Sequence, residues 1–91
     1  MAQFLHIGLN FAEATKVEEL IPVFDKALDW VRYAPNCWIV WTTSSHEQWY
    51  ARLKPHLTDR DHLFISTLDL QHGYSGWLPQ VVWDWLSKNR A

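Results

Sequence analysis

Residues 36–57 constrain the fold more than any other segment of this chain. Residues 38–42, WIVWT, are apolar or β-branched at every position, which predicts a strand buried on both faces. Ser44, followed three residues later by Glu47, has the pattern of a capping box and predicts that a helix begins there. A doubly buried strand that leads directly into a helix is typical of a layered domain built from helices and a sheet.

The N-terminal third predicts a strand followed by a helix. Residues 3–11 alternate apolar and polar side chains, as in a strand with one buried face. Thr15 and Glu18 form a second possible capping box, and apolar side chains follow at helical spacing as far as Leu28. Pro22 lies inside this stretch, so we expect either a kinked helix or a helix that begins late, after an irregular turn.

The remaining segments complete a recognisable order of elements. Residues 30–33 combine aromatic and β-branched side chains and predict a second strand rather than the end of the preceding helix. A helix over residues 46–54, disturbed at Pro55, a strand over residues 63–70 and a last helix with Pro79 in its first turn follow. This order is the βαββαβ pattern of the ferredoxin-like fold with an appended C-terminal helix. We therefore expect one α+β domain over residues 1–91.

In a βαββαβ domain two helices cover one sheet face and leave the other open. Either Trp38 and Val40 or Ile39 and Trp41 must point to that open face, which we expect the C-terminal helix, a second copy of the chain or both to cover. Seven tryptophans are more than a 91-residue core can easily hide, which favours an interface. We therefore predict a homodimer with Trp38, Val40 and Trp41 at its interface.

Charge and cysteine content exclude several classes of protein. The net charge of −2 argues against tight, nonspecific binding of nucleic acid, which needs many Lys and Arg side chains. Cys37 is the single cysteine, so an intrachain disulfide is impossible. The chain opens with no charged-then-apolar leader and has no apolar run long enough to span a bilayer. We expect a cytoplasmic protein with no membrane contact and no cofactor.

Five segments carry a resemblance to a known family. The segments CWIVWTT, WYARLKPHL, DRDHLFI, GWLP and VWDWL resemble the SinR-like proteins, a bacterial group related to the small CRISPR-associated protein that is second in that system's numbering. The resemblance spans roughly residues 30–86. It implies a ferredoxin-like fold and a homodimer, with metal-dependent nuclease activity in some relatives and a non-catalytic bridging role in others.

The nuclease activity of such relatives implies an aspartate at the end of the first strand, paired across the dimer to hold a divalent metal. Asn10 takes that position here, and a neutral amide is a weaker ligand for Mg²⁺ than a carboxylate. His6 shares a strand face with Asn10, and Asp69 near the end of a later strand is the best remaining acidic candidate. A nuclease would therefore use His6, Asn10 and Asp69 with Mg²⁺ or Mn²⁺, whereas no other metal site is expected.

Basic side chains near the second predicted helix are the candidates for nucleic-acid contact. Arg52, Lys54 and Arg60 lie close in sequence to Trp49 and Tyr50, which together predict a basic, aromatic strip or an ordinary solvated helix face. Three functions remain open. The first is a non-catalytic homodimeric module that contacts protein or nucleic acid. The second is a metal-dependent nuclease, and the third is an adaptor or inhibitor that binds another protein through a tryptophan-rich surface.

Overall fold

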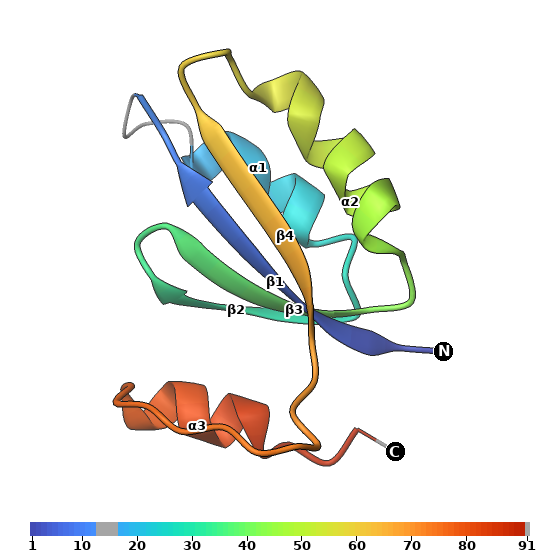
Figure 1. Cartoon of the computed structure of the whole chain (residues 1–91), viewed down its shortest axis with the longest axis vertical. Coiled ribbons are helices and arrows are strands. Elements are labelled where there is room, and N and C mark those ends of the chain that lie inside the picture. The colour runs from blue at the N-terminus through green and yellow to red at the C-terminus, as the bar shows by residue number, and fades with distance from the viewer. Residues whose placement is uncertain (13–16, 91) are drawn as a thin grey trace.

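The computed structural model describes residues 1–12 and 17–90, which form an α+β domain (Figure 1). The elements, in chain order, are β1 (Gln3–Asn10), α1 (Val17–Phe24), β2 (Asp29–Ala34), β3 (Cys37–Thr42), α2 (His46–Leu53), the 3₁₀ turn η2 (Lys54–His56), β4 (His62–Leu68) and α3 (Gln80–Leu86). The predicted α+β class is confirmed, and residues 30–33 are a strand, as expected. None of the described helices is long and apolar enough to cross a membrane.

The four strands form one antiparallel sheet in the order β2-β3-β1-β4. β1 lies at the centre, where Gly8 is opposite Cys37 of β3 on one side and opposite Phe64 of β4 on the other. The last residue of β1, Asn10, is opposite His62 at the beginning of β4. β2 and β4 are therefore the two edges of the sheet.

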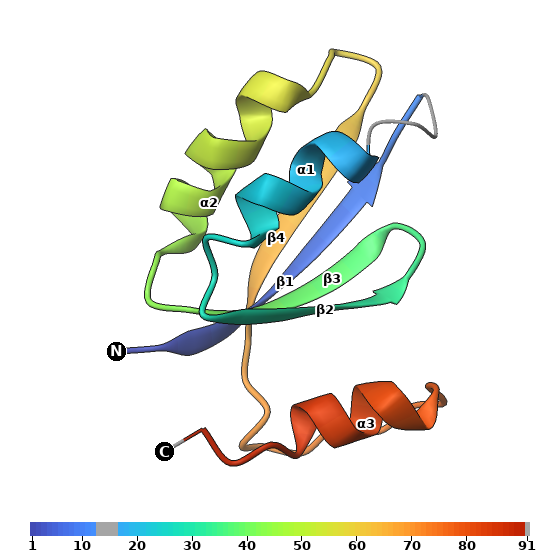
Figure 2. The ribbon, with the colours of Figure 1, turned by 180° about the vertical axis from the view of Figure 1, so that it is seen from behind.

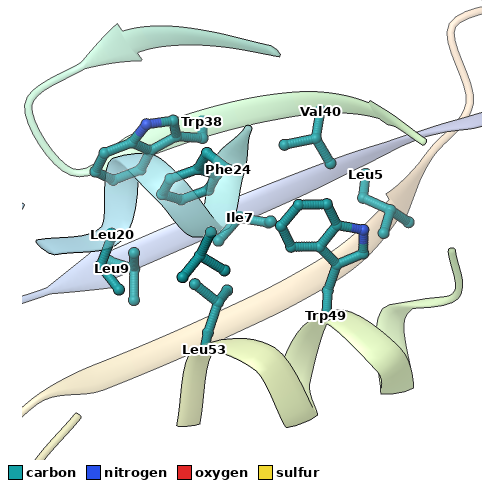
Figure 3. Close-up of a cluster of buried hydrophobic side chains, with 10 residues drawn as sticks. Leu5, Ile7, Leu9, Leu20, Phe24, Trp38, Val40, Trp49 and Leu53 are labelled. Atoms are coloured by element: carbon teal, nitrogen blue, oxygen red, sulfur yellow. The ribbon is translucent and has the colours of Figure 1, made fainter. Parts of the chain in front are cut away.

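The main core lies between the sheet and the helices α1 and α2, which cover the same face (Figures 1 and 3). Trp38 stacks on Phe24 of α1 with ring centroids 4.7 Å apart and an angle of 8° between the ring planes. The alternation predicted for the first strand is confirmed, because the inward side chains Leu5, Ile7 and Leu9 are buried. This face is thus closed by the chain's own helices.

The C-terminal helix α3 covers part of the opposite sheet face, as expected (Figure 2). Val82, Trp85 and Leu86 of α3 pack on Ile39, and Phe4 and Trp41 line the same cluster. The rings of Phe4 and Trp41 lie 4.6 Å apart. Phe4 is near the beginning of β1, and Ile39 and Trp41 are on β3, opposite His6 and Phe4. In the described part of the chain, the α3 cluster includes neither Gly8 nor Asn10, which lie toward the other end of β1.

The predicted dimer interface is wrong for two of its three residues. The side chains of Trp38 and Val40 point toward α1 and α2 and are 0% exposed in a single chain, so they cannot contact a second copy. Trp41 does lie on the other face, but it is half-buried beside Phe4 and the α3 cluster. The strand is doubly buried as predicted, and its own three helices provide the cover.

The start of α2 differs from the expectation, and the start of α1 decides between the two alternatives for that helix. Ser45, not Ser44, caps α2: its Oγ accepts from the Gln48 amide at 3.1 Å, and Gln48 Oε1 accepts from the Ser45 amide at 2.8 Å. α1 begins at Val17 and Pro22 lies inside it, on the exposed side, so the late start, one of the two alternatives for this segment, is wrong. The proposed Thr15 cap lies outside the described residues.

Candidate functional site

The structure does not bring the three candidate nuclease residues together. Leu68, the residue before Asp69, pairs with Phe4 near the beginning of β1, whereas Asn10 ends that strand. Asn10 follows Phe4 by six residue steps along the strand, which is roughly 20 Å. Asp69 instead lies 2.5 Å from Nδ1 of His72 and accepts from the Gln71 amide.

Metal ligands are equally scattered. Within residues 1–12 and 17–90, no three His, Cys, Asp or Glu side chains gather closely enough to hold a metal ion. His6 is engaged elsewhere, because its Nε2 lies 2.5 Å from the hydroxyl of Tyr33. The described part of the chain therefore presents no assembled ligand set for Mg²⁺ or Mn²⁺.

The basic strip is divided between one packed and two exposed side chains. The guanidinium of Arg52 lies over the Trp49 ring, 5.1 Å from its centroid, and its Nη1 is buried without a hydrogen-bond partner. Lys54 and Arg60 are exposed. Arg52 thus serves mainly to cover a core tryptophan, which leaves Lys54 and Arg60 as the accessible cations of the three.

A groove of about 400 Å³ opens on the sheet face that α3 leaves uncovered. Gly8 lies between Cys37 and Phe64 in this groove, and the Phe64 side chain is 69% exposed. The residues that line the groove come from the ends of β1, β3 and β4 and the turn before β3: Gly8, Leu9, Asn10, Asn36, Cys37, His62, Leu63 and Phe64. Of the candidates named from sequence, Asn10 alone lines this groove.

A polar network lies between this groove and α3. Burial lowers the pKa of His6 below its usual 6.5, which favours the neutral imidazole near pH 7, and its Nε2 shares a hydrogen bond with the Tyr33 hydroxyl. Burial, with a further contribution from the neighbouring Cys37, raises the pKa of Tyr33 to about 12. The His6 ring extends toward the groove, since a Cβ atom on Gly8 would lie 3.6 Å from its Cε1. The network is therefore uncharged at neutral pH.

Sequence reasoning missed Phe64, His62 and Asn36 as neighbours of Asn10. Their proximity depends on the pairing of β1 with β4, two strands that lie far apart in sequence. The prediction of a strand over residues 63–70 indicates which of its side chains share a face, because strand side chains point alternately to the two faces, but not which residues of the first strand they meet.

A second exposed surface lies on the connector before α3 and on α3 itself. Trp77 is 98% exposed, and the side chains of Tyr74 and Val81 nearby in sequence are also exposed. Tyr74 stacks on Trp83 with ring centroids 6.1 Å apart. We call Tyr74, Trp77 and Val81 the Trp77 patch.

No family model matches the chain, and no curated protein or solved structure matches it either.

Proposed function

We propose that this chain is a non-catalytic, homodimeric interaction module with a ferredoxin-like fold, of the SinR-like type, that contacts a protein or nucleic-acid partner. The strand order β2-β3-β1-β4 and the two helices on one sheet face support the ferredoxin-like arrangement. Of the described residues, the three suggested for a nuclease are dispersed, which supports a role without catalysis.

The Trp77 patch is the observation that carries this proposal. An indole at 98% exposure presents almost its whole surface to water, and Tyr74 and Val81, three and four residues away in the chain, are exposed as well. Tryptophan and tyrosine are enriched among the residues that dominate the binding energy of protein interfaces. In a two-fold dimer one such patch meets its own copy, so a single exposed tryptophan supplies two buried anchors.

The oligomeric state tests this interface. We expect wild-type protein to have the mass of a dimer in sedimentation equilibrium and Trp77→Ser to have that of a monomer with an unchanged circular dichroism spectrum. Leu28→Ser is the matched control, because Leu28 is also an exposed apolar residue, at the end of the segment between α1 and β2. A monomeric wild type, or a Trp77→Ser variant that remains a dimer, contradicts the proposed interface.

The absence of catalysis is tested separately. We expect no cleavage of single- or double-stranded RNA or DNA by purified protein in the presence of Mg²⁺ or Mn²⁺. Metal-dependent cleavage that disappears in Asn10→Ala, His6→Ala or Asp69→Ala would establish the nuclease instead.

A further inference from the structure

The groove around Gly8 has a flat floor beside an exposed aromatic ring. Side chains alternate along β1, so His6, Gly8 and Asn10 belong to the same sheet face, and the middle residue has no side chain. The strand therefore carries no side chain of its own at Gly8, between Cys37 and Phe64, and the His6 ring lies at van der Waals distance from the position that a Cβ would take. The Phe64 ring, 69% exposed, forms one side of this floor.

The polar groups of the groove are neutral amides and an imidazole. Asn10 and Asn36 each supply a donor and an acceptor, and the His62 side chain lies opposite Asn10 on the paired strand. None of the described residues that line the groove is an Asp, Glu, Lys or Arg. Such a lining favours a ligand that is neutral, planar and able to hydrogen-bond along its edge, and it offers no cation for a phosphate.

We propose that this groove binds a nucleobase, with the ring of the base stacked on Phe64 and its polar edge directed to Asn10, Asn36 and His62. Stacking on exposed aromatic side chains and hydrogen bonding to base edges are the general means by which proteins hold unpaired bases. The volume of about 400 Å³ lies within the range of small-ligand sites. Sugar and phosphate extend into solvent, away from the groove.

The groove is separate from the proposed dimer interface. Phe64 and Gly8 are on the sheet, whereas the Trp77 patch is on the connector and α3. His6 and Tyr33, which share a hydrogen bond, are not among the residues that line the groove, and Tyr33 packs on the cluster that α3 covers. Base binding thus specifies the ligand class of the proposed interaction module and rests on that function, but it can fail while the proposed dimer holds, and the dimer can fail while base binding holds.

Amide chemical shifts test the site directly. ¹⁵N-labelled protein is titrated with adenosine, guanosine, cytidine and uridine, and in parallel with eight-nucleotide single strands of A and of U. We expect saturable shifts at the amides of Gly8, Cys37 and Phe64 with at least one base. Binding by nucleosides identifies the base alone as sufficient. Strands that bind much more tightly, with added shifts at Lys54 or Arg60, identify single-stranded nucleic acid as the source.

Four variants separate the groove from other surfaces. Phe64→Ala removes the stacking platform and is expected to weaken binding by about fivefold to a hundredfold, whereas Phe64→Tyr keeps the ring and restores it. Gly8→Ala adds a methyl group to the floor and is expected to weaken binding; its Cβ meets no atom closer than 3.6 Å, so the strand is retained. Tyr50→Ala is the matched control, because Tyr50 is an exposed aromatic outside the groove, on α2.

Alkylation of Cys37 provides a second readout. Cys37 is the single cysteine and lines the groove, so a bound base is expected to slow its reaction with iodoacetamide. The proposal is overturned if no base shifts the groove amides, if the shifts map to another surface, or if Phe64→Ala binds as tightly as wild type. Since the spectra themselves report folding, a misfolded variant is recognised and replaced by Phe64→Leu, from which the same loss is expected.

Discussion

The indole Nε1 of Trp49 donates a hydrogen bond of 3.1 Å to the hydroxyl oxygen of Thr42, and both side chains are buried. Trp49 is visible in Figure 3, between α2 and the sheet. The same oxygen accepts a second bond, of 3.0 Å, from the amide of Ser44. One hydroxyl at the end of β3 therefore joins the sheet, the turn that follows it and the first turns of α2.

Thr42→Val leaves both donors without their acceptor at nearly constant side-chain volume. Because an unsatisfied buried donor costs about 1–3 kcal/mol, we expect the free energy of unfolding to fall by about 2–4 kcal/mol in urea denaturation. Thr67→Val is the control, since Thr67 is an exposed threonine in β4; it should change stability by less than about 0.5 kcal/mol. Equal effects of the two substitutions would contradict the role of the Thr42 hydroxyl.

Substitution of Ser44 and Ser45 in turn tests which of the two is the N-cap of α2. Ser45→Ala removes the side chain that accepts from the Gln48 amide, which is expected to lower stability by about 1 kcal/mol. Ser44→Ala keeps that bond and should cost much less. Thermal unfolding of the two variants under identical conditions measures the difference in stability. A larger loss of stability in Ser44→Ala than in Ser45→Ala would show that Ser44 is the N-cap, as first expected from the sequence.

His6 makes stability depend on pH in a defined direction. Burial lowers its pKa in the folded state below the 6.5 expected of the unfolded chain. As the pH falls below about 6.5, the unfolded chain binds a proton that folded His6 resists, so the free energy of unfolding decreases until the folded pKa is passed. Well above pH 6.5, where the imidazole is neutral in both states, this residue contributes no slope.

Urea midpoints between pH 5 and pH 8 measure this effect by difference. We expect His6→Gln to show a shallower loss of stability at low pH than wild type, while other titrating groups act equally on both proteins. His46→Gln is the control, because His46 is exposed at the start of α2. Parallel profiles for wild type and His6→Gln would show that His6 titrates alike in the two states.

Arg90 holds the segment after α3 against Trp85 of that helix. Its guanidinium lies 4.2 Å from the centroid of the Trp85 ring, and its Nη2 donates to the Trp85 carbonyl at 2.6 Å. Removing both interactions in Arg90→Ala should raise the hydrogen-exchange rates of α3 amides about tenfold, which corresponds to about 1.4 kcal/mol. Amides in the centre of β1 should be unaffected, and Arg60→Ala is the exposed control. Unchanged α3 rates would assign the stability of this helix to its apolar contacts alone.

Periodicity predicted the elements well, because it reflects burial that each segment carries in its own residues. The doubly apolar run at residues 38–42 is a central strand with a covered surface on both sides. The exact residue at which a helix begins was harder to predict. Ser44–Glu47 and Ser45–Gln48 both match a capping box, and only the hydrogen bond from the Ser44 amide to Thr42 places Ser44 in the turn. The groove depends on register between distant strands, which local sequence does not encode.

The position of β1 at the centre of the sheet has a consequence for synthesis on the ribosome. β1 is synthesised before both of its partners, and it pairs on one side with β3 and on the other with β4, which ends at Leu68. A nascent chain that stops before β4 therefore carries a central strand with one unpaired edge, which is a template for association with other chains. We expect fragments ending between β3 and β4 to aggregate, and productive folding to wait until the last strand has left the exit tunnel.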